Sequence, residues 1–444
     1  MKEQILELLD NKQFNEIKKN LIDMNDFDIA EILNEVEEVN LLKIFRLLKK
    51  DQAANVFSYL DIDLQQLLIN KLTDTEQVNI ITNLYTDDAA DLLDELPSNI
   101  VKKILNKVDK QTRHDINTLL KYPENSAGSI MTVELIDLKE KLTIDDALKR
   151  IRKLASEQES IETSYVITNE RVLLGSVNLK DIILNEPDIL IKDIMDDNII
   201  SVYTYTDQEE VASIMKDYDL TSIPVTDSEK RLVGIITVDD IIDILEEETT
   251  EDIEKMAAIL PTEKPYLKLS ILDIYKSRIP WLLLLMISAT FTGKIIEHYE
   301  ASLATYVILT SFIPMLMNTG GNAGGQSSVT IIRGLSLDEI EFKDTFKIMF
   351  KECRVSILLG LTLSIVNFLK LLLLDKLSLT VSLVVSLTII VTVVLAQLIG
   401  CILPILAKKL KLDPAVMASP FITTIVDAVS LITYFKIASI LLGI

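Results

Sequence analysis

Long hydrophobic tracts in the last third of this 444-residue chain most constrain how it can fold. Residues 355–374, 377–403 and 415–442 are each long enough to cross a hydrocarbon core of ~30 Å as a helix of about 20 residues. Two weaker tracts, 279–296 and 303–319, bring the expected number of spans to five. The sequence therefore predicts a multi-pass membrane protein with its spans in residues 276–444.

Charge is unevenly divided between this region and the rest. The chain has 44 Lys and Arg against 67 Asp and Glu, a net charge of −23, and residues 276–444 hold 14 of the basic and 10 of the acidic residues. Residues 1–275 hold the other 30 basic and 57 acidic residues, a net charge of −27. So acidic a region repels nucleic-acid phosphates, and no nucleic-acid partner is expected. The two cysteines, Cys353 and Cys401, both lie in the hydrophobic region, which excludes a disulfide framework and a Cys/His zinc site.

Basic residues in two loops between the tracts predict the orientation, because cytoplasmic loops are enriched in Lys and Arg. The first loop carries Arg333, Lys343, Lys347, Lys351 and Arg354, and the second carries Lys408, Lys409 and Lys411. With both loops inside and five spans, we expect a plasma-membrane protein whose N-terminus is cytoplasmic and whose C-terminus is extracytoplasmic.

Asp427 is an ionisable residue deep in the last tract. A charge at that depth costs a few kcal/mol on insertion scales and normally faces a pore or an ion. The alternative is a carboxylate hydrogen-bonded to Ser or Thr of a neighbouring span. No well-placed basic partner is expected, because Lys370 and Lys436 lie toward the outer ends of their tracts.

The segment from Pro314 to Gln326 combines one proline with four glycines. This composition predicts an interrupted or thinned helix, and irregular backbone at membrane depth lines a cavity or packs against protein. Freed carbonyls near Gly321 and Gly324, with the side chains of Asn322 and Gln326, would then present oxygens to water or a hydrated ion. Close packing of small residues is the alternative.

The acidic part of the chain contains two kinds of repeat. Residues 1–127 show short helices with apolar residues at three- and four-residue spacing, which predicts a helical superhelix. In residues 128–247 a unit of strand, helix, strand, turn, strand and helix occurs twice. The copies are offset by 64 residues at Met131 and Met195 but by 59 at Gly175 and Gly234, so the first has about five extra residues.

This repeat resembles a tandem pair of CBS domains. In the second copy Thr237 and Asp240 match the family's ribose-contacting pattern, and in the first copy the equivalents are Asn178 and Asp181. The resemblance implies an adenine nucleotide such as ATP, with Asp181 and Thr237 as contacts. Many CBS pairs bind no nucleotide, which is the alternative.

Carboxylates also cluster where the repeat ends. Asp240, Asp243, Glu247 and Glu251 share one helical stripe, beside Glu248 and Asp252, and a second acidic group is Asp87, Asp88, Asp91, Asp94 and Glu95. A solvated acidic face is the common explanation. Carboxylates without cationic partners also suit Mg²⁺ or Ca²⁺, so we expect a cation-dependent contact between these groups.

The whole chain resembles the MgtE family of magnesium channels. The motif Pro-x-x-Met-x-x-x-Gly-Asn-x-Gly-x-Gln is complete in residues 314–326, and the order of regions also matches. These regions are an acidic helical domain (1–127), tandem CBS domains of α/β type (128–247), a connecting helix (248–275) and a five-helix transmembrane domain (276–444). The resemblance implies a homodimer with its pore on the two-fold axis, where two copies of Asp427 hold hydrated Mg²⁺.

The resemblance also implies that cytosolic Mg²⁺ closes the pore by bridging the acidic domains. The implied regulatory residues are Asp87, Asp91, Glu209, Asp219, Asp240, Asp243, Glu248, Glu251, Asp252 and Asp413. Asp413 precedes Pro414, so an N-cap of the last span explains it equally well.

Three other functions compete with a magnesium channel. Oxygen ligands do not separate Mg²⁺ from Mn²⁺, so a transporter of Mn²⁺ or Co²⁺ is one alternative. A membrane sensor that conducts no ion is the second. An enzyme is not expected, because the two histidines, His114 and His298, are far apart in the sequence and no nucleophile–base pair or Walker-type loop occurs.

Overall fold

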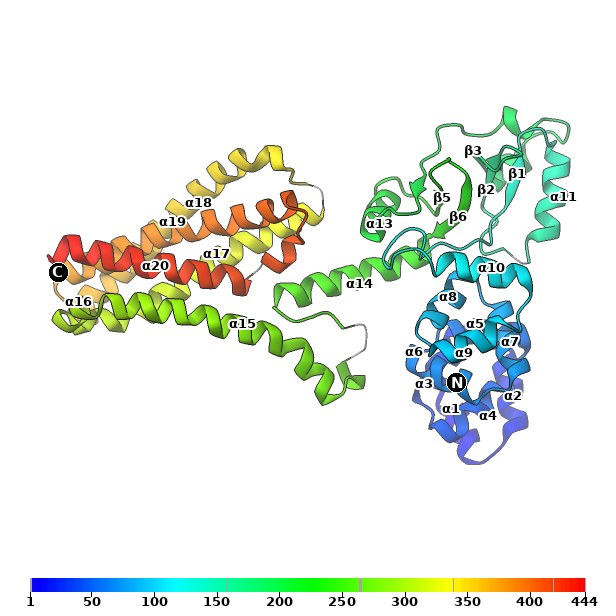
Figure 1. The fold of residues 1–444 in the computed structure, drawn as a ribbon, viewed down its shortest axis with the longest axis horizontal. Coiled ribbons are helices and arrows are strands. Elements are labelled where there is room, and N and C mark those ends of the chain that lie inside the picture. The colour runs from blue at the N-terminus through cyan, green and yellow to red at the C-terminus, as the bar shows by residue number, and fades with distance from the viewer. Residues whose placement is uncertain (1, 157, 263–265, 338, 418, 444) are drawn as a thin grey trace. The chain divides into compact units, whose positions relative to one another are not determined.

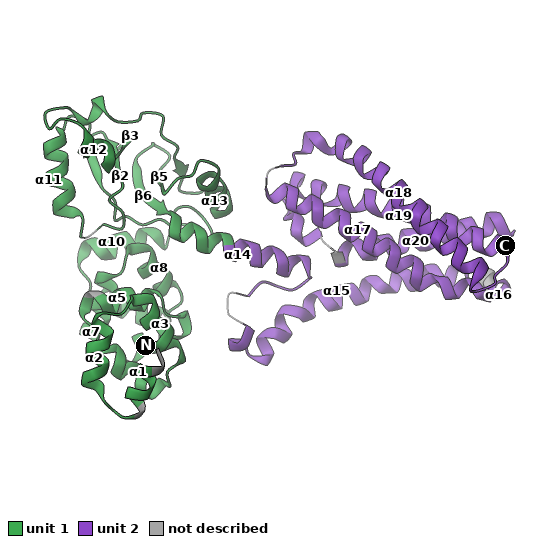
Figure 2. Cartoon of the chain, turned by 180° about the vertical axis from the view of Figure 1, so that it is seen from behind, with its two compact units in different colours: residues 1–245 green, residues 246–444 purple. Residues whose placement is uncertain are grey.

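A computed structural model describes residues 2–156, 158–262, 266–337, 339–417 and 419–443. The chain divides into two compact units, residues 1–245 and 246–444 (Figure 2).

Unit 1 begins with short amphipathic helices, several of which start at a clear cap. Thr73 and Glu76 form a capping box at one helix start, and Glu76 also accepts two hydrogen bonds from Arg46, at 2.8 and 3.0 Å. Helices two places apart in the sequence pack together, as α3 does on α5 and α5 on α7 (Figure 1). This stagger confirms the predicted helical superhelix. The helices are α1 (Lys2–Asp10), α2 (Phe14–Ile22), α3 (Asp26–Glu35), α4 (Glu38–Phe45), α5 (Lys50–Ser58), α6 (Ile62–Lys71), α7 (Asp74–Asn83), α8 (Thr86–Asp94), α9 (Ser98–Leu105) and α10 (Lys110–Leu119).

The two predicted repeat copies form two small sheets of the same topology. In each sheet the first strand is parallel to the second and the second antiparallel to the third. The first copy contains β1 (Asp137–Lys139), α11 (Ile144–Leu154), β2 (Thr163–Ile167), β3 (Leu173–Asn178) and α12 (Leu179–Leu184), followed by the short helix η1 (Ile191–Asp193). The second contains β4 (Val202–Tyr203), α13 (Gln208–Asp217), β5 (Ser222–Thr226), β6 (Leu232–Thr237) and α14 (Val238–Met256).

The copies hold each other through exchanged backbone contacts. The segment that leads into the first copy pairs with the second sheet, Thr132 with Ile235, and the segment that leads into the second copy pairs with the first sheet, Asp196 with Ser176. Glycine is needed at both crossings, since a Cβ on Gly175 would lie 2.4 Å from the Asp196 carbonyl oxygen. The matching Met and Gly positions of the two copies therefore mark these crossings.

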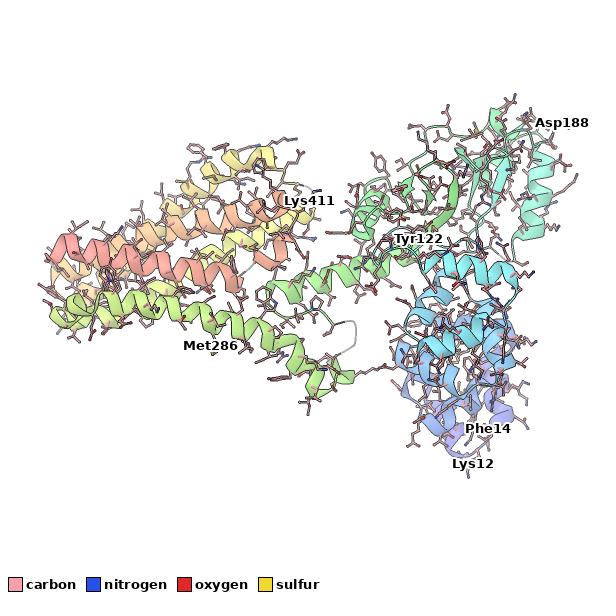
Figure 3. All side chains as sticks on the ribbon, in the orientation of Figure 1. Lys12, Phe14, Tyr122, Asp188, Met286 and Lys411 are labelled. Atoms are coloured by element: carbon pink, nitrogen blue, oxygen red, sulfur yellow. The ribbon has the colours of Figure 1, made fainter. Side chains whose placement is uncertain are left out.

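Unit 2 contains the end of α14 and the hydrophobic helices. Four of its described helical segments are long and apolar enough to span a membrane: 271–298, 342–373, 379–409 and 414–442. Apolar side chains stay exposed on α15, where Met286 is 62% exposed (Figure 3). The elements are η2 (Tyr266–Lys268), α15 (Ile271–His298), α16 (Glu300–Thr305), η3 (Val307–Phe312), α17 (Ile313–Ser336), η4 (Phe342–Asp344), α18 (Thr345–Leu373), α19 (Leu379–Lys409), η5 (Pro414–Met417) and α20 (Ser419–Leu442).

Two details of the membrane prediction were wrong. Residues 303–319 do not form one span, because α16, η3 and the first residues of α17 share them. The glycine-rich segment does not break its helix either: α17 runs unbroken from Ile313 to Ser336, with Pro314 in its first turn, where no hydrogen bond is lost. The fifth long helix is therefore α17 itself.

Tight packing explains why this helix keeps its glycines. A Cβ on Gly324 would lie 3.1 Å from the Ala396 carbonyl oxygen, and one on Gly400 would lie 2.2 Å from the Gly324 carbonyl oxygen. A Cβ on Gly321 would lie 3.0 Å from the Thr423 side chain. The glycines thus allow α17 to approach α19 and α20 closely, as in the small-residue alternative.

Candidate functional site: carboxylates without and with a cation

Asp427 lies half-buried in the middle of α20. No described residue donates a hydrogen bond to its carboxylate or forms an ion pair with it. The nearby hydroxyls of Thr423 and Thr424 donate instead to the Pro420 carbonyl oxygen, at 2.9 and 3.1 Å. The described contacts therefore give no support to a carboxylate satisfied by Ser or Thr.

Polar side chains form an exposed stripe on α17. Asn318, Asn322 and Gln326 recur at four-residue intervals and are all exposed, as is Pro314, while Gly321 and Gly324 are buried on the opposite side. The Asn322 amide donates to the Asn318 amide oxygen at 3.3 Å. Amides that face lipid would be costly, so this stripe requires water or another protein surface.

Three carboxylates from distant parts of unit 1 meet at one place. Asp87 lies in the first turn of α8, Glu159 in the segment between α11 and β2, and Asp240 in the first turn of α14. One oxygen from each lies within 4.8 Å of the others, a spacing that suits a metal ion. We call these three residues the Asp87 cluster.

The Asp87 cluster has few compensating hydrogen bonds. Asp87 is only 8% exposed, and its Oδ1 accepts from the Asp88 backbone N–H at 2.9 Å. The Thr237 hydroxyl lies 2.9 Å from Glu159 Oε1 and 2.7 Å from Asp240 Oδ2, but its one proton serves a single acceptor at a time. Glu159 Oε2 is buried with no hydrogen-bond partner.

Burial and mutual repulsion raise the pKa of every carboxyl group there. Burial, then the charges of Glu159 and Asp240, raises the pKa of Asp87 well above its usual range. Burial and neighbouring carboxylates raise the pKa of Glu159 to about 7 and that of Asp240 to about 6. The pKa of the adjacent Asp88 rises to about 6 for the same reasons. Buried oxygen ligands with excess negative charge are what a hard divalent cation binds.

Glu159 was not among the residues expected from the sequence. The available signal was the excess length of the first repeat copy. The extra residues lie between α11 and β2, where the connection 155–162 is longer than the corresponding connection 218–221 of the second copy. This longer segment carries Glu159 to Asp87 and Asp240.

The other expected regulatory residues of unit 1 lie outside this cluster. Within the described residues, no second group of three acidic side chains has metal-like spacing. Asp219 follows α13 with a left-handed φ of 51°. Asp91 on α8, Glu209 on α13, Asp219 and Asp243 on α14 are all exposed.

Three of the four expected regulatory acids of unit 2 lie near one lysine. Lys255 Nζ lies 2.6 Å from Glu251 Oε1 and 2.6 Å from Asp413 Oδ2. Asp252 accepts a hydrogen bond from the Ser336 hydroxyl at 3.4 Å, and burial together with the Asp413 charge raises its pKa. We call Glu251, Asp252 and Asp413 the Asp413 cluster. The assumption that these acids lack a cationic partner was wrong, since Lys255 is one helical turn from Glu251.

Asp413 also caps a helix, as one interpretation of its sequence predicted. Its Oδ1 accepts from the Ala415 backbone N–H at 2.8 Å at the start of η5. The cap uses Oδ1 and the ion pair uses Oδ2, so both roles coexist. Glu248, one turn before Asp252, is half-buried on α14.

The two expected nucleotide contacts lie in different copies of the repeat. The Thr237 hydroxyl belongs to the Asp87 cluster, and Asp181 lies half-buried in the first turn of α12. No described hydrogen bond joins the two residues.

The chain is 33% identical to the magnesium transporter MgtE of Thermus thermophilus over 435 residues, which cover 96% of this chain and 95% of that protein. The chain belongs to the MgtE family of magnesium transporters. MgtE of Bacillus subtilis is 32% identical over 98% of this chain and 96% of its own length.

The regions of the chain match MgtE separately as well. Residues 313–437 match the family described as "Divalent cation transporter", 24–125 the MgtE intracellular N domain and 191–247 a CBS domain. A crystal structure of the cytosolic domain of the Mg²⁺ channel MgtE in complex with ATP superposes with a TM-score of 0.53 at 32% identity, covering 55% of this chain and all of that one. A crystal structure of the soluble part of a magnesium transporter superposes with the same TM-score at 31% identity. The match covers 56% of this chain and 97% of the chain in that structure.

Membership of the MgtE family establishes several of the expectations. The chain is a divalent-cation transporter rather than an enzyme, and a membrane protein with several candidate transmembrane helices. The overall order of helical domain, CBS pair and long apolar helices is confirmed.

Proposed function

We propose that this chain is a Mg²⁺ channel in which Asp427 holds the ion. The observation that carries the proposal is a half-buried membrane carboxylate that no described residue satisfies. Mg²⁺ gives up its water reluctantly and is bound through one or two carboxylates, so Asp427 would hold the hydrated ion.

A homodimer would complete this site. Two copies related by a two-fold axis would place two Asp427 carboxylates about one ion, with the stripe of Asn318, Asn322 and Gln326 lining the approach. The exposed amides of α17 support this arrangement, because a second protomer or pore water would satisfy them. The protein would sit in the plasma membrane with its N-terminus cytoplasmic and its C-terminus extracytoplasmic.

Cytosolic Mg²⁺ would close this channel through the acidic clusters. Mg²⁺ at Asp87, Glu159 and Asp240 would join the N-terminal helices to the CBS pair, and Mg²⁺ at the Asp413 cluster would fix the end of α14. The remaining regulatory acids, Asp91, Glu209, Asp219, Asp243 and Glu248, would bind further ions or shift the balance of charge. The ion biases gating only if it binds the closed state more tightly than the open state.

An adenine nucleotide, ATP being the example, would bind the CBS pair as a second regulator. The solved relative carries ATP in its cytosolic domain. Asp181 would accept hydrogen bonds from the ribose. Thr237 would contribute only after leaving the carboxylates it now contacts.

Flux into proteoliposomes tests the channel proposal. We expect electrogenic Mg²⁺ entry, at low internal Mg²⁺, into vesicles that hold the wild-type protein or Glu297→Ala. Glu297 is an exposed carboxylate at the end of α15 and serves as the matched control. Asp427→Ala should reduce entry to the level of empty vesicles.

The outcomes separate the alternatives. Equal background entry for all three proteins would favour a sensor that conducts no ion. Wild-type flux that persists in Asp427→Ala would remove this carboxylate from the ion path. Entry of Mn²⁺ or Co²⁺ in preference to Mg²⁺ would assign the channel to another divalent ion.

A further inference from the structure

The ammonium group of Lys255 stands between the carboxylates to which the proposed function assigns Mg²⁺. It pairs with Glu251 on its own helix and with Asp413 before η5, both at 2.6 Å. Its side chain is 22% exposed, less than those of its two partners at 36% and 34%. The two carboxylates raise its pKa against the opposing effect of burial, so it remains a cation.

We propose that Lys255 is a tethered competitor of Mg²⁺, which holds the Asp413 cluster together when the ion is scarce and must be displaced for the ion to bind. The proposal rests on the proposed regulation by Mg²⁺ and deepens it. Lys255 would thereby set the concentration at which this part of the sensor responds.

The chemistry of the two cations supports an exchange. Mg²⁺ takes oxygen ligands in near-octahedral geometry, and an ammonium group within hydrogen-bond distance of two of them cannot share that site. Lys255 reaches the carboxylates on a flexible four-carbon stem, so its ammonium group can leave without movement of the backbone. With Lys255 in place the three carboxylates do not have metal-like spacing, so the exchange draws their oxygens together and replaces one positive charge by two.

Apolar packing keeps the site in place during the exchange. Met256, the residue after Lys255, packs against Ile332 of α17 and Ala415 of η5. Glu251, Asp252 and Asp413 therefore remain near one another when Lys255 turns away. Because of this contact, we expect the site to exchange one cation for another rather than to separate when Lys255 is displaced.

Hydrogen–deuterium exchange of the full-length protein, measured against MgCl₂ concentration, tests the proposal. Amides of residues 246–256 report the Asp413 cluster, and amides of α8 report the Asp87 cluster in the same sample. The variant is Lys255→Met, which keeps the stem and removes the charge. Lys347→Met is the matched control, because Lys347 is exposed and no described ion pair includes it.

Two changes are expected in Lys255→Met. Without Mg²⁺, residues 246–256 should exchange faster than in the wild type, because three carboxylates repel one another. With Mg²⁺, half-maximal protection of the same residues should occur at an about fivefold lower concentration, a size typical of coupling between two binding events. Lys347→Met should match the wild type.

A second variant keeps the test decisive if Lys255→Met is unstable. Lys255→Arg retains the charge and can bind a carboxylate through two parallel hydrogen bonds. It should resist displacement and raise the half-maximal concentration.

An unchanged or higher half-maximal concentration in Lys255→Met, or an unchanged one in Lys255→Arg, would overturn the competitor and leave Lys255 a structural bridge. If α8 still responds to Mg²⁺ in that case, the proposed regulation stands. If neither α8 nor residues 246–256 of the wild type respond, the proposed regulation fails together with this inference.

Discussion

The Asp87 cluster and the Asp413 cluster solve the same electrostatic problem differently. Each contains three carboxylates, which come from three segments in the Asp87 cluster and from two in the Asp413 cluster. These carboxylates repel one another unless a cation or proton intervenes. In the Asp413 cluster Lys255 supplies a cation from the chain itself. In the Asp87 cluster no described lysine or arginine does so, and burial raises the pKa of each member.

This difference predicts two kinds of response to Mg²⁺. In the Asp87 cluster the carboxylates should repel one another without Mg²⁺, and binding of the ion should remove this repulsion. The Asp413 cluster should be held together in both conditions, first by Lys255 and then by Mg²⁺. A sensor with one site of each kind responds over a wider range of Mg²⁺ concentration than a sensor with two sites of the same kind.

Giving the Asp87 cluster a cation of its own should have the largest effect. Glu159→Lys places an ammonium group near Asp87 and Asp240, as Lys255 lies near Asp413 and Glu251. We expect α8 to be protected from hydrogen exchange without Mg²⁺, and the concentration that gives half-maximal Mg²⁺ protection to rise by at least about tenfold. Glu162→Lys changes charge equally at an exposed position of the same segment and is the control.

If α8 of the Glu159→Lys protein reaches half-maximal protection at the same Mg²⁺ concentration as the wild type, the proposed difference between the clusters would be wrong. This result would show that the three carboxylates do not share one ion.

Matched amide substitutions in the two clusters should have opposite effects without Mg²⁺. Asp87→Asn removes the carboxyl group whose charged form burial and the charges of Glu159 and Asp240 disfavour, so the opening free energy of α8 should increase by about 1–2 kcal/mol. Asp413→Asn removes a partner of Lys255. The opening free energy of residues 246–256 should therefore decrease by about 0.5–1 kcal/mol. Asparagine can still cap η5, so the decrease in opening free energy measures the contribution of the ion pair between Lys255 and Asp413.

Exchange rates in EDTA give both opening free energies. A decrease in both variants would mean that Asp87 stabilises its surroundings without a metal. An increase in both would mean that Lys255 contributes nothing to the Asp413 cluster.

The sequence predicted local and repeated features well, but not contacts between distant segments. The spacing of Met131, Met195, Gly175 and Gly234 located both copies of the strand–helix unit, because each crossing needs a glycine and places a methionine against it. Helix propensity misjudged α17, since contacts with α19 and α20 compensate for its glycines. The expectation of Asp427 as the pore residue remains a prediction.

The two residues that define the contrast were missed for different reasons. Glu159 joins Asp87 only through the fold, and the extra length of its segment was the one available signal. Lys255 could have been noticed, because a lysine four residues after a glutamate pairs with it on a helix. Its second partner, Asp413, is 158 residues away and required the structure.

The pH dependence of stability should also differ between the clusters. The pKa values of Glu159 (about 7), Asp240 and Asp88 (both about 6) are raised by folding. The folded state therefore binds protons more readily than the unfolded state, and stability falls as pH rises through these values. In EDTA we expect unit 1 to lose about 1–3 kcal/mol between about pH 5 and pH 8.

Thermal unfolding of the full-length protein, followed with and without saturating Mg²⁺, measures this trend. Mg²⁺ binds the deprotonated carboxylates, so it should flatten or reverse the loss. Unit 2 should lose less, because Lys255 already balances part of the charge around Asp252. A flat profile of unit 1 in EDTA would contradict the raised pKa values.

Ionic strength should produce the smallest effect, and its sign should differ between the clusters. Raising salt from about 0.1 M to about 1 M shortens the Debye length from ~10 to ~3 Å, which weakens repulsion and attraction alike. Without Mg²⁺, α8 should become better protected from hydrogen exchange as its carboxylates repel less, and residues 246–256 should become less protected as the Lys255 ion pairs weaken. Each change should be a few tenths of a kcal/mol, since buried charges are poorly screened and exposed pairs contribute little. Tetramethylammonium chloride is the salt of choice, because its cation lacks the donors and the small size needed to enter either cluster. Changes of the same sign in both clusters would mean that salt acts on the whole protein, and that the two clusters do not differ in the way their charges are balanced.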